Sequence, residues 1–229
     1  FMRDFLLKIK FINFKLNNLK FKKFLKLIKT IFSRLIVRTF SLGLKVPKWH
    51  LNATFQSRDY KSKVVRISNM FRTNFAIEIG CGIGEILGRL NASQKYGIDI
   101  NIDTLVLCKR LNKNIKTIHN DIMKNNQKIF ELINSIEKNE TILILMVNWL
   151  HEYSENKVNN LVENLLSLNR NIIIVADIYQ RKELSRKPKN KIVHKFKDLK
   201  NINFYKKVTD IDEVRDLAIL SNQDKIHFS

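Results

Sequence analysis

The sequence predicts an α/β protein whose mostly parallel sheet is covered by helices on both faces. Short apolar runs of strand length alternate along the chain with longer segments of helical spacing. The first run, residues 75–79, is followed at once by three glycines at alternate positions between residues 80 and 84. Acidic residues end the next two runs, at Asp99 and near Asp121. These features place a ligand site at the carboxyl ends of the first three strands.

The loop after the first strand is suited to close contact between a ligand and the backbone. Its glycines are Gly80, Gly82 and Gly84. Glycine permits positive φ angles and carries no side chain that would hold a ligand away. A helical segment, residues 85–90, is expected next and would present free N–H groups to the ligand. The dinucleotide fingerprint G-x-G-x-x-G needs a glycine where this chain has Glu85, and a carboxylate there would repel a pyrophosphate.

The run Glu78-Ile-Gly-Cys-Gly-Ile-Gly84 resembles motif I of the class I S-adenosylmethionine-dependent methyltransferases. The resemblance implies that this loop, Cys81 included, wraps the amino-acid end of S-adenosylmethionine, which carries an ammonium and a sulfonium but no phosphate. Carboxylates at Glu78 and Glu85 suit such a cation better than a pyrophosphate. Taken alone, the motif leaves open a glycine-rich turn in some other α/β protein.

Two acids further along the chain strengthen the resemblance. Asp99 lies nineteen residues after the first glycine of the loop, where an acid that holds ribose hydroxyls is expected. The resemblance implies that Asp121 contacts the adenine amino group. Ile100 and Ile122, which follow the two acids, are included in the predicted cofactor site. The alternative for each aspartate is a helix N-cap or a turn residue.

The resemblance covers residues 61–177 and implies a Rossmann-like sheet of seven strands whose last two strands form a hairpin. The strands are expected at residues 75–79, 94–99, 115–121, 141–147, 171–177, 203–208 and 216–220. The fourth and fifth are continuous apolar runs, as expected of strands that are buried on both faces. Further helices are expected at residues 58–69 and 158–168.

The fourth strand leads into Asn148-Trp149-Leu-His151, which should lie beside the transferred methyl group. DNA amino-methyltransferases carry Asn/Asp-Pro-Pro-aromatic here, and this chain lacks both prolines. It is more similar to small-molecule methyltransferases, in which a histidine near this position can act as a base. Asn148 is therefore assigned to the cofactor site and Trp149 to the acceptor site.

Methyl transfer to a hydroxyl needs a base, and histidine suits this role because it titrates near neutrality. His151 is the first candidate, because of its position after the fourth strand. His194 is the second, if the basic segment around it folds back as a lid, and His50 is the third. A structural hydrogen bond within its own turn is the alternative for His151. Trp49 and Tyr60 complete the predicted acceptor site, with core packing as the alternative for Tyr60 and His50.

Four short segments are also similar to small bacterial methyltransferases of surface-polysaccharide gene clusters. They are Trp49-His50, Glu78-Ile-Gly-Cys-Gly82, Asn148-Trp-Leu-His151 and His194-Lys-Phe196. This resemblance implies a small-molecule or glycan-type acceptor: a sugar hydroxyl, a sugar-linked group or a nucleotide-activated precursor. A non-catalytic protein that keeps the cofactor-binding fold is a further class left open.

The net charge of +21 is concentrated in two segments. Residues 1–48 carry 13 basic side chains and one acidic side chain, and residues 181–207 carry 11 and two. If these segments bind phosphates, the chain would be a nucleic-acid (RNA) methyltransferase, which is the alternative function. The competing explanation is compositional, because the abundant Lys, Asn, Ile and Phe all have AT-rich codons.

Residues 1–48 are predicted to form a basic helical arm before a methyltransferase domain at 49–229, with Pro47 near the boundary. Apolar residues between positions 5 and 37 recur at helical spacing, and lysines fill the other faces. No apolar run reaches the ~18–20 residues that span a bilayer. Two alternatives remain open: a helix that lies on the inner face of a membrane, and a helix that caps the domain.

The two cysteines, Cys81 and Cys108, provide neither a disulfide framework nor the spacing of metal ligands. No metal is therefore expected, and a reducing cytoplasm is the simplest compartment. The arm also lacks the uninterrupted apolar stretch and small-residue cleavage site of a secretory signal peptide.

Overall fold

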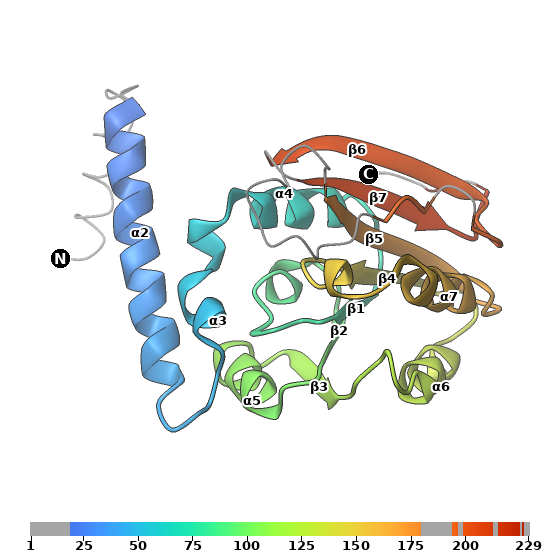
Figure 1. Ribbon diagram of the computed structural model, residues 1–229, viewed down its shortest axis with the longest axis horizontal. Coiled ribbons are helices and arrows are strands. Elements are labelled where there is room, and N and C mark those ends of the chain that lie inside the picture. Colours follow the sequence, from blue (N-terminus) through green and yellow to red (C-terminus); the bar gives the residue numbers. More distant parts are fainter. Residues whose placement is uncertain (1–18, 180–193, 197–198, 213–214, 225, 227–229) are drawn as a thin grey trace.

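A seven-stranded sheet lies at the centre of the protein (Figure 1). The computed structural model describes residues 19–179, 194–196, 199–212, 215–224 and 226. The strands are β1 (Phe75–Ile79), β2 (Gln94–Asp99), β3 (Ile115–His119), β4 (Thr141–Met146), β5 (Asn171–Tyr179), β6 (Phe204–Asp212) and β7 (Arg215–Ser221). Their order is β3-β2-β1-β4-β5-β7-β6, and β7 runs opposite to the other six strands, antiparallel to both β5 and β6. This confirms the predicted Rossmann-like sheet with a terminal hairpin.

Helices cover both faces of the sheet, which explains why its central strands are apolar throughout. The helices are α2 (Leu19–Phe40), α3 (Lys48–Asn52), α4 (Asp59–Ser68), α5 (Ile102–Leu111), α6 (Gln127–Ser135) and α7 (Glu155–Leu166). In β4, Ile142, Ile144 and Met146 share a core with side chains of α6 and α7. The alternate residues Leu143 and Leu145 share a second core with α4 and α5. The period of two along the strand thus separates the two layers.

The segment after the glycine loop is the main difference from the expected fold. The predicted helix at residues 85–90 is wrong, because only the single 3₁₀ turn η2 (Leu87–Arg89) forms there. The Leu87 N–H donates to the Glu78 carboxylate over 3.1 Å and so has a side-chain partner. Gly88 lies against the side chain of Asn112, at the end of α5, where a Cβ atom would overlap it. This close approach holds the segment in a tight turn.

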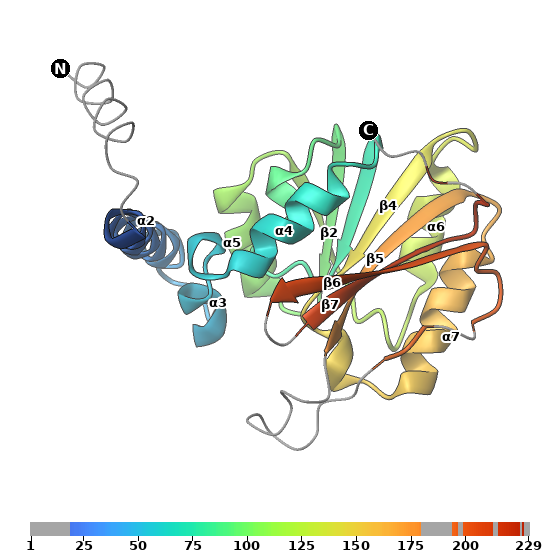
Figure 2. The same ribbon diagram turned by 90° about the horizontal axis from the view of Figure 1, so that it is seen from above.

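The helix α2 lies outside the sheet layers, alongside α3 and α5 (Figure 2). Its C-terminal part contributes Val37 to a small core that also contains Leu107 of α5. Arg110 donates to the carbonyl oxygens of Phe40 and Leu42 and so ties the end of α2 to α5. Residues 1–18 of the predicted arm lie outside the described residues. Within the part described, no helix combines the length and apolarity needed to cross a membrane.

Candidate active site

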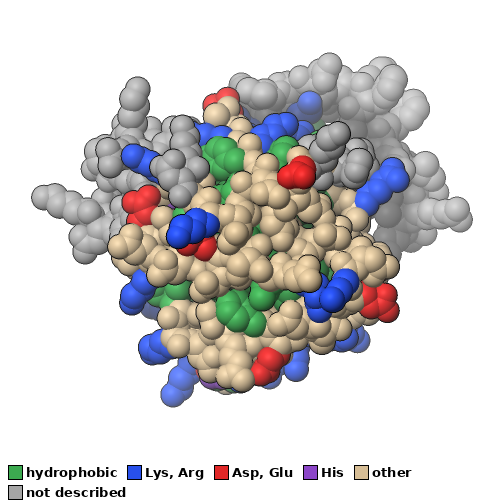
Figure 3. All heavy atoms as spheres, turned by 90° about the vertical axis from the view of Figure 1, so that its right-hand side faces the viewer, with side chains coloured by type: hydrophobic (Ala, Val, Ile, Leu, Met, Phe, Trp, Pro, Cys, Tyr) green, Lys and Arg blue, Asp and Glu red, His purple; other side chains and the backbone are tan. Residues whose placement is uncertain are grey.

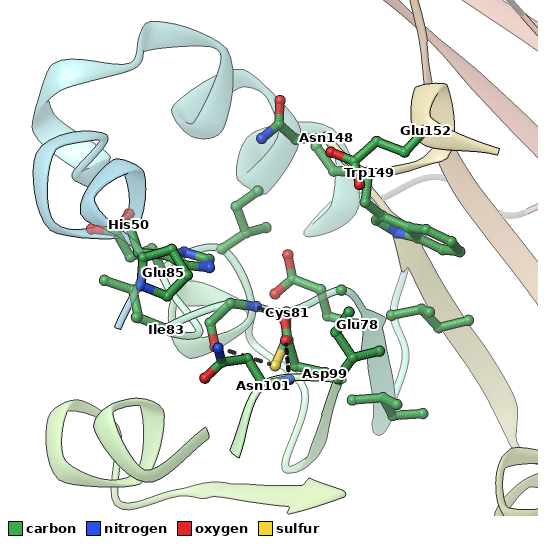
Figure 4. Close-up of a pocket in the computed structure, with 18 of the residues that line it drawn as sticks. His50, Glu78, Cys81, Ile83, Glu85, Asp99, Asn101, Asn148, Trp149 and Glu152 are labelled. Carbon is green, nitrogen blue, oxygen red and sulfur yellow. Dashed lines mark hydrogen bonds between the residues drawn. The ribbon is translucent and has the colours of Figure 1, made fainter. Parts of the chain in front are cut away.

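A cavity of about 420 Å³ opens at the carboxyl ends of β1, β2 and β4. The glycine loop forms its floor, and α3 with the start of α4 closes one side. In Figure 4, His50 lies on one side of the cavity and Trp149 on the other, with Asp99 and Cys81 between them. The cavity therefore lies at the edge of the sheet where the sequence places the ligand.

Two glycines of the loop let aromatic side chains approach its backbone closely. Gly80 and Gly82 have φ angles of 70° and 53°. A Cβ atom on Gly80 would lie 2.6 Å from Cδ1 of Trp149, and one on Gly82 would overlap the imidazole of His50. Gly84 has a different role, because a Cβ there would meet Cys108 of α5 at 2.6 Å. Gly84 does not line the cavity, and it allows the loop to pack on α5.

Asp99, at the end of β2, is held firmly against the glycine loop. One carboxylate oxygen accepts the N–H of Gly82 and the other accepts the N–H of Asn101, both over 2.9 Å. Asn101 in turn caps α5 by accepting the N–H of Thr104. Because a carboxylate offers about four acceptor sites, Asp99 can still accept hydrogen bonds from a bound ligand.

Glu78 places a buried carboxyl group on the wall of the cavity. Burial raises its pKa to about 8, although the hydrogen bond from the Leu87 N–H acts in the opposite direction. A cation placed next to Glu78 would compensate this desolvation and favour the ionised carboxylate. The geometry therefore suits a positively charged ligand group.

Glu85, the second predicted acid of the rim, already has protein partners. It forms an ion pair with Lys61 of α4 at 2.5 Å and accepts the N–H of Phe55 over 2.7 Å. Its side chain is only 12% exposed. Glu85 therefore joins the glycine-loop segment to α4 and to the turn at Phe55. Of the two predicted acids, Glu78 is the one whose carboxyl group remains available for a cationic ligand.

The far end of the cavity has an apolar wall with an acid at its edge. Ile100 lines the cavity and remains 59% exposed, and the buried Ile122 lines it as well. Asp121 accepts the N–H of Met123 over 3.2 Å and pairs with Lys124 at 3.2 Å. This combination suits a flat heterocycle that packs on aliphatic side chains and donates a hydrogen bond at its rim.

Of the three candidate histidines, His50 is the one that lines the cavity. It is buried beneath the exposed indole of Trp49, with ring centroids 3.4 Å apart, and it lies over Gly82. Burial and the nearby charge of Lys61 lower its pKa to about 3. The imidazole is therefore neutral at physiological pH.

The other two candidate histidines do not line the cavity. His194 is buried, and its Nε2 lies 2.9 Å from the carbonyl oxygen of Leu150. His151 is also buried, within the 3₁₀ turn η3 (Leu150–Glu152), with Nε2 4.0 Å from Glu152. His194 thus contacts the turn that follows β4 and His151 is part of it, and neither side chain lines the cavity.

A buried charged network supports the loop after β4, and the sequence did not reveal it. Asn148 has a φ angle of 70° and donates its N–H to Asp177 over 2.9 Å. Asp177 pairs with Arg215 at 3.4 Å, and the Arg215 guanidinium lies 3.7 Å from the ring centre of Tyr60. Burial raises the pKa of Tyr60 to about 12, so its hydroxyl stays protonated. Asn148 and Tyr60 both line the cavity.

The cavity has further lining residues that the sequence analysis missed. They are Lys61, Asn101, Asn120, Glu152 and Tyr153, together with backbone and apolar neighbours of the predicted residues. Asn101, Asn120 and Tyr153 are close in sequence to predicted residues, so widening each motif by two positions would have included them. The same widening would have included Lys61, which follows Tyr60, and Glu152, which follows His151, although the sequence does not show that Lys61 pairs with Glu85.

Comparisons with known proteins address the fold. No family model matches the chain, and no curated protein matches its sequence. Among solved structures, one match is the N-methyltransferase NodS from Bradyrhizobium japonicum WM9, in complex with S-adenosyl-L-homocysteine. The TM-score is 0.56 at 15% sequence identity, and the match covers 83% of this chain and 98% of NodS. The fold is that of class I methyltransferases.

Two further structures extend this likeness. A putative O-methyltransferase from Nostoc punctiforme PCC 73102 matches with a TM-score of 0.55 at 10% identity, over 86% of this chain and 69% of that protein. The bifunctional kinase-methyltransferase WbdD matches with a TM-score of 0.54 at 16% identity, over 81% of this chain but only 46% of WbdD. At these identities the likeness concerns the fold, and the activity must be argued from the residues of the cavity.

Proposed function

We propose that this protein binds S-adenosylmethionine and transfers its methyl group to a small-molecule or glycan-type acceptor. The observation that carries the proposal is the glycine loop, which in a methyltransferase fold runs between the buried carboxyl of Glu78 and the carboxylate of Asp99. A dinucleotide would need anion-binding groups beside the glycine loop, whereas the Glu78 carboxyl faces the cavity there.

Each part of S-adenosylmethionine has a matching group in the cavity. The Glu78 carboxyl would hold the ammonium, because ionic pairing offsets its desolvation. Asp99 has acceptor capacity left for the ribose hydroxyls. Ile100 and Ile122 would flank the adenine, with Asp121 at its amino edge. When bound, the cofactor supplies an electrophilic methyl group on a sulfonium.

The acceptor would enter between His50 and the aromatic side chains around it. Trp49 and Tyr60 line the cavity together with His50, Trp149 lines the opposite side, and Trp49 is 54% exposed. Flat apolar surfaces with polar edges suit sugar rings, which supports a glycan-type acceptor and a role in polysaccharide biosynthesis. The neutral imidazole of His50 offers a lone pair to the acceptor hydroxyl, although burial and the charge of Lys61 oppose its protonation in the free protein. As the acceptor oxygen gains the methyl group, its proton would pass to His50.

The test of cofactor binding is calorimetric titration of the full chain with S-adenosylmethionine, with S-adenosyl-L-homocysteine and, as a control, with NAD. We expect both sulfur compounds to bind and NAD to fail. Binding of NAD together with no response to either sulfur compound would overturn the proposal.

The test of the acceptor is transfer of labelled methyl groups to fractionated cell extract and to purified oligosaccharide and nucleotide-sugar fractions. We expect label in the carbohydrate fractions. The alternative, methylation of RNA through the basic segments, would instead give label in nucleic acid and binding that weakens steeply with salt. The net charge of +21 motivates this alternative, although residues 181–193 lie outside the described part of the chain.

The role of His50 is tested by substitution. His50→Gln should bind the cofactor normally and lose turnover by about 100-fold, as expected when a general base is removed. His151→Gln and His194→Gln are the matched comparisons, because these histidines are buried away from the cavity. Unchanged turnover in His50→Gln would remove His50 as the base, and loss only in His151→Gln would restore the first sequence-based candidate.

A further inference from the structure

The helix α2 turns its apolar side away from the protein. Of thirteen large apolar side chains exposed in the described part of the chain, nine lie between residues 24 and 42. Those on α2 follow helical spacing and include Phe24, Leu27, Ile28, Ile31, Phe32, Leu35 and Ile36. We call these seven residues the outer face of α2. An amphipathic helix that caps a domain would normally bury this side.

Polar contacts fix α2 in this orientation. Lys26 pairs with Asp59 at 2.6 Å, and the Ser33 hydroxyl donates to Thr54 over 2.8 Å. Arg34 donates to the carbonyl oxygen of Asn52 over 3.0 Å. The side that meets α3 and the turn η1 (Phe55–Ser57) is thus mostly polar, and the side chains of the outer face remain 40–64% exposed among the residues that the structure describes.

Basic side chains accompany the outer face on both edges. The helix carries seven Lys or Arg residues and no acidic residue. At 3.6 residues per turn, Lys22 and Lys29 follow one edge of the outer face and Lys23 and Arg38 follow the other. Elsewhere the surface is more mixed: on the side opposite α2, apolar side chains are scattered among polar groups of both charges (Figure 3).

We propose that the outer face of α2 docks in the interface of a membrane that contains anionic lipids. An apolar strip between two rows of cations suits a lipid interface, because apolar burial and attraction to acidic headgroups act together. From Phe24 to Ile36 the strip extends about 18 Å along a single helix, at 1.5 Å per residue. A second copy is disfavoured, because pairing two such helices would bring their cations together.

Docking through α2 would attach the wall of the cavity to the membrane. The contacts of Lys26, Ser33 and Arg34 all lead to residues 52–59, which adjoin Trp49 and His50 on one side and α4 on the other. The membrane-bound helix and the acceptor side of the cavity would therefore move as one unit, which would favour an acceptor that is itself presented at a membrane surface.

The experiment measures binding of the full chain to lipid vesicles by co-sedimentation. We expect binding to vesicles of equal parts phosphatidylglycerol and phosphatidylcholine, and much weaker binding to phosphatidylcholine alone or at high salt. The variant Ile28→Gln/Phe32→Gln should reduce the partition coefficient at least about tenfold, because two apolar side chains no longer enter the interface. Both residues are exposed, so circular dichroism should show an unchanged fold.

The matched control is Met70→Gln/Ile102→Gln, which removes two exposed apolar side chains from other elements and should bind like the unchanged chain. No binding to the anionic vesicles, or equal binding of the α2 variant, would overturn the proposal. So would self-association that the α2 variant abolishes while neither form binds vesicles, because the face would then join two copies. Calorimetry with S-adenosylmethionine is independent of these outcomes, so failure here leaves the proposed function standing.

Discussion

At the scale of single residues, the Glu78 carboxyl carries the most information about the ligand. It is buried next to the glycine loop, and burial raises its pKa to about 8. The folded protein therefore retains a proton that the unfolded chain loses near pH 4.5. The contribution of Glu78 to the free energy of unfolding is therefore complete below pH 4.5 and is lost as the pH rises to about 8. A cation beside Glu78 would compensate the desolvation of its carboxylate, so the site is suited to a cationic ligand.

The variant Glu78→Gln separates stability from binding. Glutamine cannot ionise, so we expect the variant to gain stability relative to the unchanged chain as the pH rises from 5 to 8. Binding of S-adenosylmethionine should fall at least about tenfold, because the ammonium loses its ionic partner. Thermal melts at pH 5 and pH 8, together with calorimetry, give both readouts. A stability difference that does not change with pH would show that Glu78 ionises normally in the folded protein.

The Gly82→Ala variant tests the contact between the glycine loop and His50. Alanine at a positive φ costs about 1–2 kcal/mol of stability, and its Cβ would also displace the imidazole. Gly43→Ala is the matched control, because Gly43 has a φ angle of 78° but no neighbouring atom within 4 Å of an added Cβ. We expect both variants to lose stability and only Gly82→Ala to lose cofactor binding. Equal binding by both would contradict the close contact.

At the scale of elements, the ion pair between Lys61 and Glu85 joins α4 to the glycine-loop segment. Both side chains are 12% exposed, and Lys61 also donates to the carbonyl oxygen of Ala53 over 2.6 Å. These contacts hold the wall that carries His50 in place. When one partner of a poorly exposed ion pair is removed, the other charge stays partly buried without compensation, which lowers the stability of the protein. A double-mutant cycle should therefore show a coupling energy between Lys61 and Glu85.

Lys61→Met should destabilise the protein by about 3 kcal/mol, because Glu85 would keep a partly buried charge without its partner. The double variant Lys61→Met/Glu85→Gln should recover part of this loss, which chemical denaturation would measure. The pKa of His50 should rise in Lys61→Met, since the charge of Lys61 lowers it. Titration of the His50 ring by NMR checks this direction, and an unchanged pKa would leave burial as the cause.

At the scale of the whole molecule, the net charge of +21 acts against compactness through mutual repulsion. Raising sodium chloride from about 0.02 to 0.3 M shortens the screening distance several-fold. We therefore expect the melting temperature to rise by a few degrees over this range at constant pH. Differential scanning calorimetry measures it, and a melting temperature that falls with salt would show that paired charges outweigh the repulsion.

The sequence by itself determined the sheet, the glycine loop and the acids at the strand ends. These depend on local features: apolar runs of strand length, glycines at fixed spacing, and carboxylates directly after strands. All three are legible without knowledge of the packing, which is why Gly80, Asp99 and Asp121 lie at the cavity as expected.

Only the tertiary structure decided which groups meet across the cavity. Asp177 and Arg215 are 38 residues apart and become partners because β7 inserts beside β5. Of the three candidate histidines, His50 lines the cavity because α3 packs on the glycine loop, whereas His151 and His194 are buried elsewhere. The helical period of α2 was visible in the sequence, but its outward direction depends on polar contacts with residues distant in the chain. Such contacts leave no local pattern, because they depend on how separate elements pack together.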